Sequence, residues 1–208
     1  MIDRAAIGRR FARLATDAAV RSPILWKLFR PVVRRQFDSL APVWDSMRLE
    51  DTFAPYDAGL DRLPGPPARI LDVGTGTGAG AIRLAQRFPE ATVVGVDLSD
   101  AMLEQARRNT SADLKVTYQR ADASALPFAD GSFDLVAHAN MIPFFDEVAR
   151  VTGRGGHALF AFSSGAGTPI YVPPERLRQE LGRRGFTDFA NVQAARGNAL
   201  LARKGDPA

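Results

Sequence analysis

Short apolar runs alternate with segments of helical spacing through the last two thirds of the chain. Apolar residues lead up to Val73 as in a buried parallel strand, and a similar run covers residues 91–97. Between these runs, residues 79–87 read as a helix with Ile82, Leu84 and Ala85 turned inward. Strands and helices that alternate in this way predict an α/β domain built on a parallel sheet.

The same pattern continues toward the C-terminus. Residues 114–119 alternate between apolar and polar positions, which predicts a third strand. A fourth apolar run ends near His138, a fifth begins at His157, and residues 189–203 fit a terminal hairpin around Arg196-Gly197. We also expect helices after Asp97, over residues 144–151 and over residues 174–181. Ser99 is the predicted N-cap of the first of these.

The N-terminal segment has a different character. Apolar positions at helical spacing, interrupted at Ser22-Pro23 and Pro31, predict a pair of amphipathic helices up to Phe37. Residues 63–67 are rich in proline and read as a stiff linker. We therefore expect a helical arm with its linker over residues 1–67 and one folded domain over residues 68–208.

Charge distinguishes this arm from the rest of the chain. Residues 1–35 contain nine Lys or Arg and two Asp, which gives a local charge of +7 within a net charge of +4. Two interpretations remain open: the helices pack on the domain, or their basic, aromatic face meets a membrane surface or a lipophilic substrate. Specific binding of nucleic acid is not expected, since a basic arm alone gives only non-specific affinity.

Composition excludes several classes of chemistry. The 208 residues include no cysteine, which excludes disulfides, thiolate metal sites and cysteine nucleophiles. Two histidines argue against a histidine-rich metal site, so we expect no metal. No apolar run reaches the ~18–20 residues of a membrane span. The N-terminus lacks an uninterrupted apolar signal core, so a cytoplasmic protein is expected.

The turn after the first strand carries the strongest chemical signal. Gly74, Gly76 and Gly78 follow that strand, and Asp97 ends the next strand 23 residues after Gly74. Glycines let a backbone approach a ligand closely, and a carboxylate at that strand end can accept both hydroxyls of a ribose. The spacing is compatible with a dinucleotide turn. Asp72 argues against one, because its carboxylate would repel a pyrophosphate but would favour the ammonium and sulfonium of a methionine moiety.

Several segments resemble one family. ILDVGTGTG at 70–78 resembles the first motif, hhDhGxGxG, of the Rossmann-like (class I) S-adenosylmethionine-dependent methyltransferases. RADASALPF at 120–128 and DGSFDLV at 130–136 resemble later segments of that family. FDSLAPVWD at 37–45 resembles a segment of its ubiquinone/menaquinone-biosynthesis branch, with Trp44 in place of the usual tyrosine.

This resemblance implies a fold and a cofactor. The fold would be a doubly wound, seven-stranded, mostly parallel sheet with an antiparallel last strand, and the N-terminal arm would be helical. The cofactor would be S-adenosyl-L-methionine, with Asp97 on its ribose, Asp122 on its adenine amino group and the turn on its methionine portion. The cofactor-binding residues implied in this way are Asp72, Gly74, Thr75, Gly76, Gly78, Asp97, Leu98, Met102, Asp122, Ala123, His138 and Trp44.

The expected activity is methyl transfer by in-line displacement to a small, hydrophobic acceptor. No catalytic base can be named beyond His138, which ends the fourth strand and could equally be a packing residue. No NPPY-like signature follows that strand, which argues against DNA and glutamine acceptors. The connection at 140–143 is short and suggests an unusual acceptor pocket. Two alternatives stay open: a degenerate cofactor-binding module that acts through a partner, and an NAD-dependent oxidoreductase, which Asp72 and the terminal hairpin disfavour.

Overall fold

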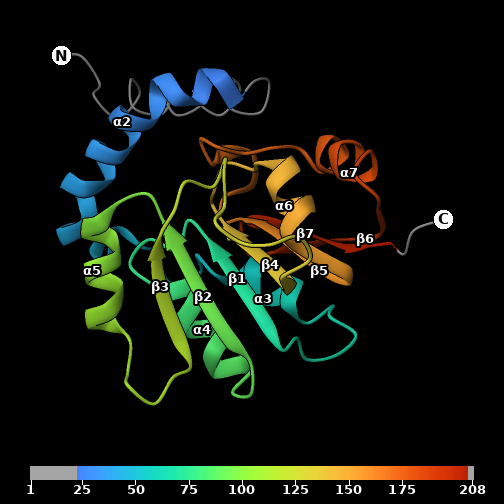
Figure 1. Ribbon diagram of the computed structural model, residues 1–208, viewed down its shortest axis with the longest axis horizontal. Helices are drawn as coiled ribbons and strands as arrows, with labels where there is room; N and C mark the ends of the chain where they lie inside the picture. Colours follow the sequence, from blue (N-terminus) through green and yellow to red (C-terminus); the bar gives the residue numbers. More distant parts are fainter. Residues whose placement is uncertain (1–22, 206–208) are drawn as a thin grey trace.

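The computed structural model describes residues 23–205, and its strands form a single seven-stranded sheet (Figure 1). The strand order is β3-β2-β1-β4-β5-β7-β6. Neighbours from β3 to β5 pair in parallel, whereas β7 is antiparallel to both β5 and β6. The predicted fold class is confirmed. The strands are β1 (Arg69–Val73), β2 (Thr92–Asp97), β3 (Val116–Arg120), β4 (Phe133–Ala139), β5 (Thr152–Phe162), β6 (Phe186–Ala194) and β7 (Gly197–Lys204).

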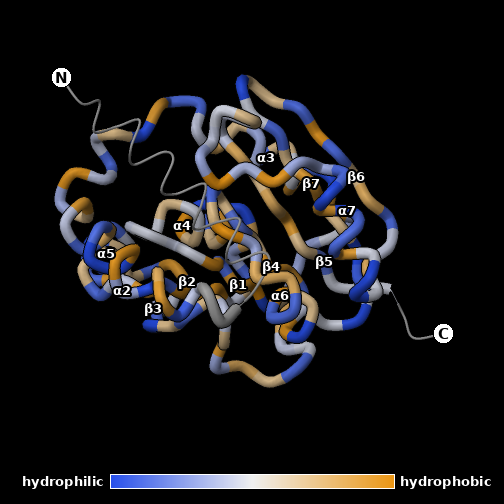
Figure 2. The backbone as a smooth tube through the Cα atoms, turned by 90° about the horizontal axis from the view of Figure 1, so that it is seen from above, coloured by the Kyte–Doolittle hydropathy of each residue, from blue (hydrophilic) through white to orange (hydrophobic). Residues whose placement is uncertain are grey.

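Helices cover both faces of the sheet. Two separate clusters of buried apolar side chains lie between the sheet and its helices, one with α3 and α4 and the other with α6 and α7. Figure 2 shows the hydrophobic residues concentrated along the strands. The helical segments are α2 (Pro23–Leu40), η1 (Ala41–Val43), η2 (Asp45–Met47), α3 (Ala54–Leu60), α4 (Ala79–Arg87), α5 (Asp100–Asn109), α6 (Phe145–Val151), η3 (Gly165–Gly167) and α7 (Pro174–Gly182).

The core follows the alternation of the strands. In β1, Ile70 belongs to the cluster under α3 and α4, whereas Leu71 belongs to the cluster under α6 and α7. Successive side chains of a strand point to opposite faces, so a strand covered on both sides must be apolar throughout. The near-continuous apolar runs of the sequence are a consequence of this double coverage.

Helix α2 covers the second of the two helices expected in the arm. It continues through Pro31, where an interruption was predicted, and is bent partway along its length (Figure 1). Proline lacks the backbone N–H of a helical hydrogen bond and crowds the preceding turn, so a helix can survive it only with a kink. The helix expected over residues 1–20 lies outside the described residues.

The ends of other elements also test the sequence predictions. Ser99 is the N-cap of α5, since its Oγ accepts a hydrogen bond of 3.1 Å from the Met102 N–H, and the terminal hairpin is present as β6 and β7. Strand β5 begins at Thr152, before the predicted His157, because Thr152 already pairs with Phe133 of β4. No helix within residues 23–205 is long and apolar enough to cross a membrane.

Helix α3 belongs to the segment that was assigned to the arm and linker. Its Tyr56 and Leu60 are buried in the cluster that also contains Ile70 and Leu84. Part of the chain before residue 68 therefore contributes to the core of the sheet. The boundary at residue 68 stays a prediction.

Candidate functional site

The site is built where the direction of strand order reverses. Strand β1 pairs with β2 on one side and with β4 on the other, so the connections after these strands leave in opposite directions. Ligands of open α/β sheets bind in the crevice at this point, outside the carboxyl ends of the strands. The glycine turn lies directly at this position, since it follows Val73 at the end of β1.

The three glycines of the turn adopt conformations that other residues avoid. Gly74, Gly76 and Gly78 have φ of 71°, 54° and 87°. At Gly78 an added Cβ would also lie 2.5 Å from the hydroxyl oxygen of Tyr118. This position therefore requires glycine both for its left-handed backbone and for its close packing. Gly78 is the N-cap of α4, and the turn thereby directs that helix onto the sheet.

Asp97 joins the turn to the end of β2. Its Oδ2 accepts a 2.9 Å hydrogen bond from the Gly76 N–H, and its Oδ1 accepts one of 2.9 Å from the Ser99 N–H. Burial raises the pKa of Asp97 above its usual value, against the opposing effect of these backbone hydrogen bonds. The carboxylate is thus fixed in orientation at the position where the sequence predicts ribose hydroxyls.

Asp72 lies beneath the turn. Its side chain is 2% exposed, and its Oδ2 accepts a 2.6 Å hydrogen bond from the Thr75 hydroxyl. Burial raises its pKa to about 6, although hydrogen bonds from Thr75 and from the backbone of Ala81 oppose the shift. Since Ala81 belongs to the first turn of α4, Asp72 links β1, the glycine turn and the helix. Contact between Asp72 and the methionine portion of a cofactor remains a prediction.

Two side chains cover the turn from outside. The Nε1 atom of Trp44 would lie 3.5 Å from a Cβ on Gly76, and the Sδ of Met141 would lie 2.6 Å from a Cβ on Gly74. Trp44 is held by an edge-on contact with Phe37, whose ring centroid is 5.4 Å away. Trp44, which the family resemblance implied as a cofactor-binding residue, is therefore brought to the turn.

The residue after Trp44 attaches this cover to the turn. Asp45 accepts hydrogen bonds of 2.5 Å from the Thr77 hydroxyl and 3.0 Å from the Asn109 amide. It also pairs with Arg48. Segment 41–48 is consequently tied to the glycine turn and to the end of α5.

Asp122 lies just beyond the end of β3 and receives donors from α2. Its Oδ1 accepts 2.9 Å from the Trp26 Nε1–H, and its Oδ2 accepts 2.8 Å from the Arg30 guanidinium. Burial alone would raise the pKa of Asp122, but hydrogen bonds from Arg30, Ser124 and Trp26 outweigh it and hold the pKa below its usual value. The carboxylate predicted to bind adenine is therefore ionised and already engaged.

A cavity of about 410 Å³ opens beside Asp122. Leu98 and Asp122 line it from the ends of β2 and β3, and Arg30 lines it from α2. Its volume lies within the ~300–1,000 Å³ typical of small-molecule sites. Of the other residues predicted to bind the adenine, Met102 is fully buried on the inner face of α5, and Ala123 is buried next to Asp122.

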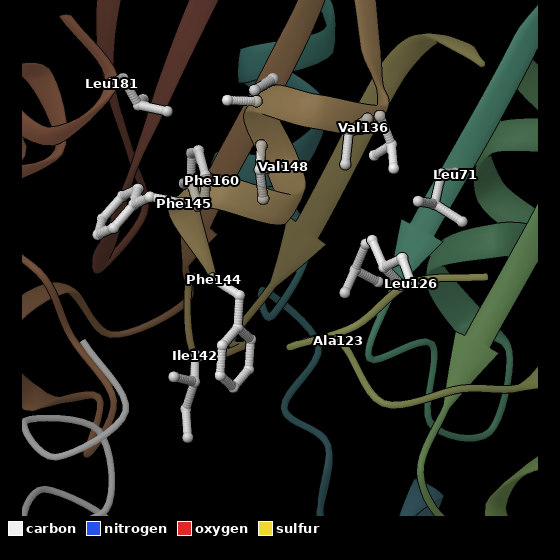
Figure 3. Close-up of a cluster of buried hydrophobic side chains, with 14 of the residues drawn as sticks. Leu71, Ala123, Leu126, Val136, Ile142, Phe144, Phe145, Val148, Phe160 and Leu181 are labelled. Atoms are coloured by element: carbon white, nitrogen blue, oxygen red, sulfur yellow. The ribbon is translucent and has the colours of Figure 1, made fainter. Parts of the chain in front are cut away.

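His138 is part of the core at the end of β4. It is 1% exposed and stacks on Phe160 with ring centroids 4.5 Å apart. Burial lowers its pKa to about 3, so the imidazole is neutral at pH 7. Figure 3 shows Phe160 among the side chains of the same cluster, with Ile142 and Phe144 from the short connection that follows β4. The geometry favours packing over proton transfer at this position.

Comparison with known proteins agrees with this geometry. Residues 70–156 match the model of the family described as "Methyltransferase domain". Residues 70–156 therefore form a methyltransferase domain. The family recognised from the sequence motifs is thereby confirmed.

Individual relatives of this methyltransferase domain show how far the likeness extends. The chain is 53% identical over 127 residues to demethylmenaquinone methyltransferase of Thermus thermophilus, across 57% of this chain and 56% of that protein. It is 46% identical over 104 residues to malonyl-[acyl-carrier protein] O-methyltransferase of Geobacter sulfurreducens, across 47% of this chain and 38% of that protein. The chain thus spans roughly half, or less, of the curated relatives that it matches.

A solved structure extends the comparison of folds. Phosphoethanolamine N-methyltransferase 2 of Haemonchus contortus, solved in complex with S-adenosyl-L-methionine, superposes with a TM-score of 0.62 at 19% identity. The superposition covers 81% of this chain and 57% of that chain. At this identity the likeness shows a shared fold.

Three residues of the site were not predicted from the sequence: Trp26, Arg30 and Met141. Trp26 and Arg30 are four positions apart, so one face of a helix presents both. That spacing was visible in the sequence. Nothing in the sequence indicated that this face would meet Asp122, which lies more than ninety positions away.

Proposed function

We propose that this protein transfers the methyl group of S-adenosylmethionine to a small, hydrophobic acceptor. The observation that carries the proposal is the carboxylate of Asp97, held by the Gly76 N–H at the point where the strand order reverses. The family match and the solved neighbour with S-adenosylmethionine support this cofactor.

The residues at this edge of the sheet fit the cofactor chemically. The two oxygens of Asp97 accept backbone N–H groups, and a carboxylate has about four acceptor positions, so further positions can accept from a ribose hydroxyl. The cavity beyond Leu98 provides room for a purine, and Asp122 offers an acceptor in its wall. The left-handed glycines of the turn carry no side chains of their own, so a ligand can approach the backbone there closely.

When bound, S-adenosylmethionine supplies a methyl group that its sulfonium charge has already activated. The contribution of the protein is then to hold the donor and acceptor in line and to exclude water. Asp97 would fix the ribose, and Trp44 and Met141 would cover the methionine portion above the turn. Alignment of this kind can contribute about 7–11 kcal/mol in favourable cases. Since His138 is buried and neutral at pH 7, we assign it no proton transfer.

The segment that covers the turn also suggests the character of the acceptor. Val43, Met47 and Leu49 are about half exposed and follow directly after α2. An apolar surface of this kind next to a site favours an apolar ligand. Among the relatives, one is named for demethylmenaquinone and another for malonyl-[acyl-carrier protein]. We propose an acceptor with a hydrophobic portion that lies between this segment and the 164–174 loop.

Transfer of a labelled methyl group tests the proposal. The purified protein would be incubated with labelled S-adenosylmethionine and with a panel of probes that includes a demethylmenaquinone analogue and a malonyl thioester. We expect label in an acceptor with wild type, loss of transfer in Asp97→Asn, and unchanged transfer in the exposed control Asp113→Asn. Binding of the cofactor without transfer to any probe would favour the alternative, a cofactor-binding module that acts through a partner.

The basic arm supports a second, separate proposal about location. On α2, Leu28 and Val32 are exposed by 72% and 50%, and they lie among Lys27, Arg34 and Arg35. Apolar side chains flanked by cations suit the surface of an anionic membrane. Sedimentation with anionic vesicles should therefore fall in Leu28→Asp/Val32→Asp. Equal sedimentation with anionic and zwitterionic vesicles would contradict the proposal.

A further inference from the structure

Arg30 of α2 occupies an unusual place for a surface arginine. Its guanidinium lies 2.8 Å from Oδ2 of Asp122, and both residues line the cavity of about 410 Å³ beside Leu98. We propose that the adenine binds in this cavity. The Arg30 guanidinium therefore occupies the carboxylate oxygen that the adenine amino group would use. The inference that follows rests on the proposed function.

The two oxygens of Asp122 differ in their partners. Oδ1 accepts three hydrogen bonds, of 2.9 Å from the Trp26 indole N–H, 3.0 Å from the Ser124 N–H and 2.8 Å from the Ser124 hydroxyl. Among the residues that the structure describes, Oδ2 accepts from Arg30 alone. A ligand amine can therefore reach this carboxylate only at Oδ2, where it meets Arg30.

The two α2 residues also differ in how firmly they are held. Trp26 is 3% exposed and packs edge-on against Phe144 with ring centroids 5.2 Å apart. The side chain of Arg30 is 45% exposed, so its guanidinium can swing into solvent while Trp26 keeps α2 in place. Partly exposed ion pairs contribute little to stability, and exchange of this pair for a ligand contact is correspondingly easy.

We propose that Arg30 determines cofactor affinity and base selectivity by competing with the amino group of the ligand for Oδ2 of Asp122. Without ligand, the guanidinium neutralises a carboxylate that is only 13% exposed. With an adenine in the cavity, the amine replaces it and Arg30 turns outward. A base with a carbonyl in place of the amine would instead keep Arg30 inside, because a carbonyl accepts from a guanidinium.

Two thioether ligands separate these cases. S-adenosylhomocysteine carries the amine, and S-inosylhomocysteine carries a carbonyl at the same position. Their affinities would be measured by calorimetry for wild type, Arg30→Ala and the control Arg35→Ala. Arg35 is an exposed arginine of the same helix, so its removal causes the same change in net charge.

We expect Arg30→Ala to bind S-adenosylhomocysteine up to about fivefold more tightly than Arg35→Ala, the range given by a partly exposed ion pair. S-inosylhomocysteine should bind Arg30→Ala more weakly than it binds Arg35→Ala. In an Asp122→Asn background the gain for S-adenosylhomocysteine should disappear, since the two groups act on one another.

Each contrary result is informative. Weaker binding of S-adenosylhomocysteine to Arg30→Ala would show that Arg30 clamps the bound ligand, and equal affinities in Arg30→Ala and Arg35→Ala would show that it does not compete. Either result would overturn the inference while leaving the proposed function intact. An absence of binding by wild type would instead overturn the proposed function itself.

Discussion

Burial of Asp72 has a consequence for stability that can be measured against pH. The carboxyl is 2% exposed beneath the glycine turn, and its pKa in the folded protein is about 6 against an ordinary value of 3.8. Asp72→Asn keeps the shape of the side chain and an oxygen that can accept from the Thr75 hydroxyl. We expect this variant to remove the pH-dependent part of the cost of burying the charge.

The sign and size follow from the two pKa values. Because the folded pKa is raised, the folded state holds a proton that the unfolded state releases between about pH 4 and pH 6. The contribution of Asp72 to the free energy of unfolding therefore falls as pH rises through this window. At 1.36 kcal/mol for each pH unit of separation, the total change is about 3 kcal/mol. Above about pH 6 the full cost is present, and below about pH 4 it is absent.

Urea unfolding of wild type and Asp72→Asn between pH 4 and pH 8 measures this effect. The difference in free energy, variant minus wild type, should rise by about 3 kcal/mol from the acidic to the neutral end of the range. Any constant offset from altered hydrogen bonding cancels in that rise. Asp122→Asn is the contrasting control: its pKa is lowered, so its difference should stay flat above about pH 4. Parallel curves for wild type and Asp72→Asn would show that burial does not raise the pKa of Asp72.

Three further predictions concern the turn and the core. Gly78→Ala should destabilise the fold by roughly 2–4 kcal/mol in urea unfolding, through its φ of 87° and the contact with Tyr118, whereas Gly76→Ala should cost only about 1–2 kcal/mol. Equal losses would contradict the packing at Gly78. Tyr56→Phe should raise stability by about 1 kcal/mol, because the buried hydroxyl has no hydrogen-bond partner among the described residues, and a clear loss would reveal one. His138→Phe should keep the stack on Phe160 and leave methyl transfer within about twofold of wild type, and abolished transfer with cofactor binding retained would give His138 a chemical role.

Much of the fold could be predicted because its strands are covered on both faces. Double coverage makes most of residues 70–73 and 93–96 apolar, and this pattern stands out in a sequence. The glycine turn and Asp97 were predictable for a related reason. The ends of neighbouring parallel strands meet at one edge, so their spacing along the chain indicates their proximity in space.

Contacts between distant segments were not predictable from local patterns. The hydrogen bonds from Trp26 and Arg30 to Asp122 join α2 to the end of β3. The spacing of apolar residues along the chain does not indicate which distant segments will pair. The direction of the Asp72 side chain was equally hidden, because its position before the turn is compatible with a carboxylate above or below it. Pro31 was expected to interrupt the helical pattern, and here the helix bends and continues.

Binding of S-adenosylmethionine by Asp97 and the glycine turn is the basis of the proposed function. Calorimetric titration of wild type and Asp97→Ala with S-adenosylmethionine, S-adenosylhomocysteine and NAD tests it most directly. We predict that wild type binds the first two ligands and not NAD, and that Asp97→Ala binds them at least about tenfold more weakly, as expected for the loss of hydrogen bonds to a charged group. Binding of NAD alone, or equal affinity of wild type and Asp97→Ala for S-adenosylhomocysteine, would contradict the account.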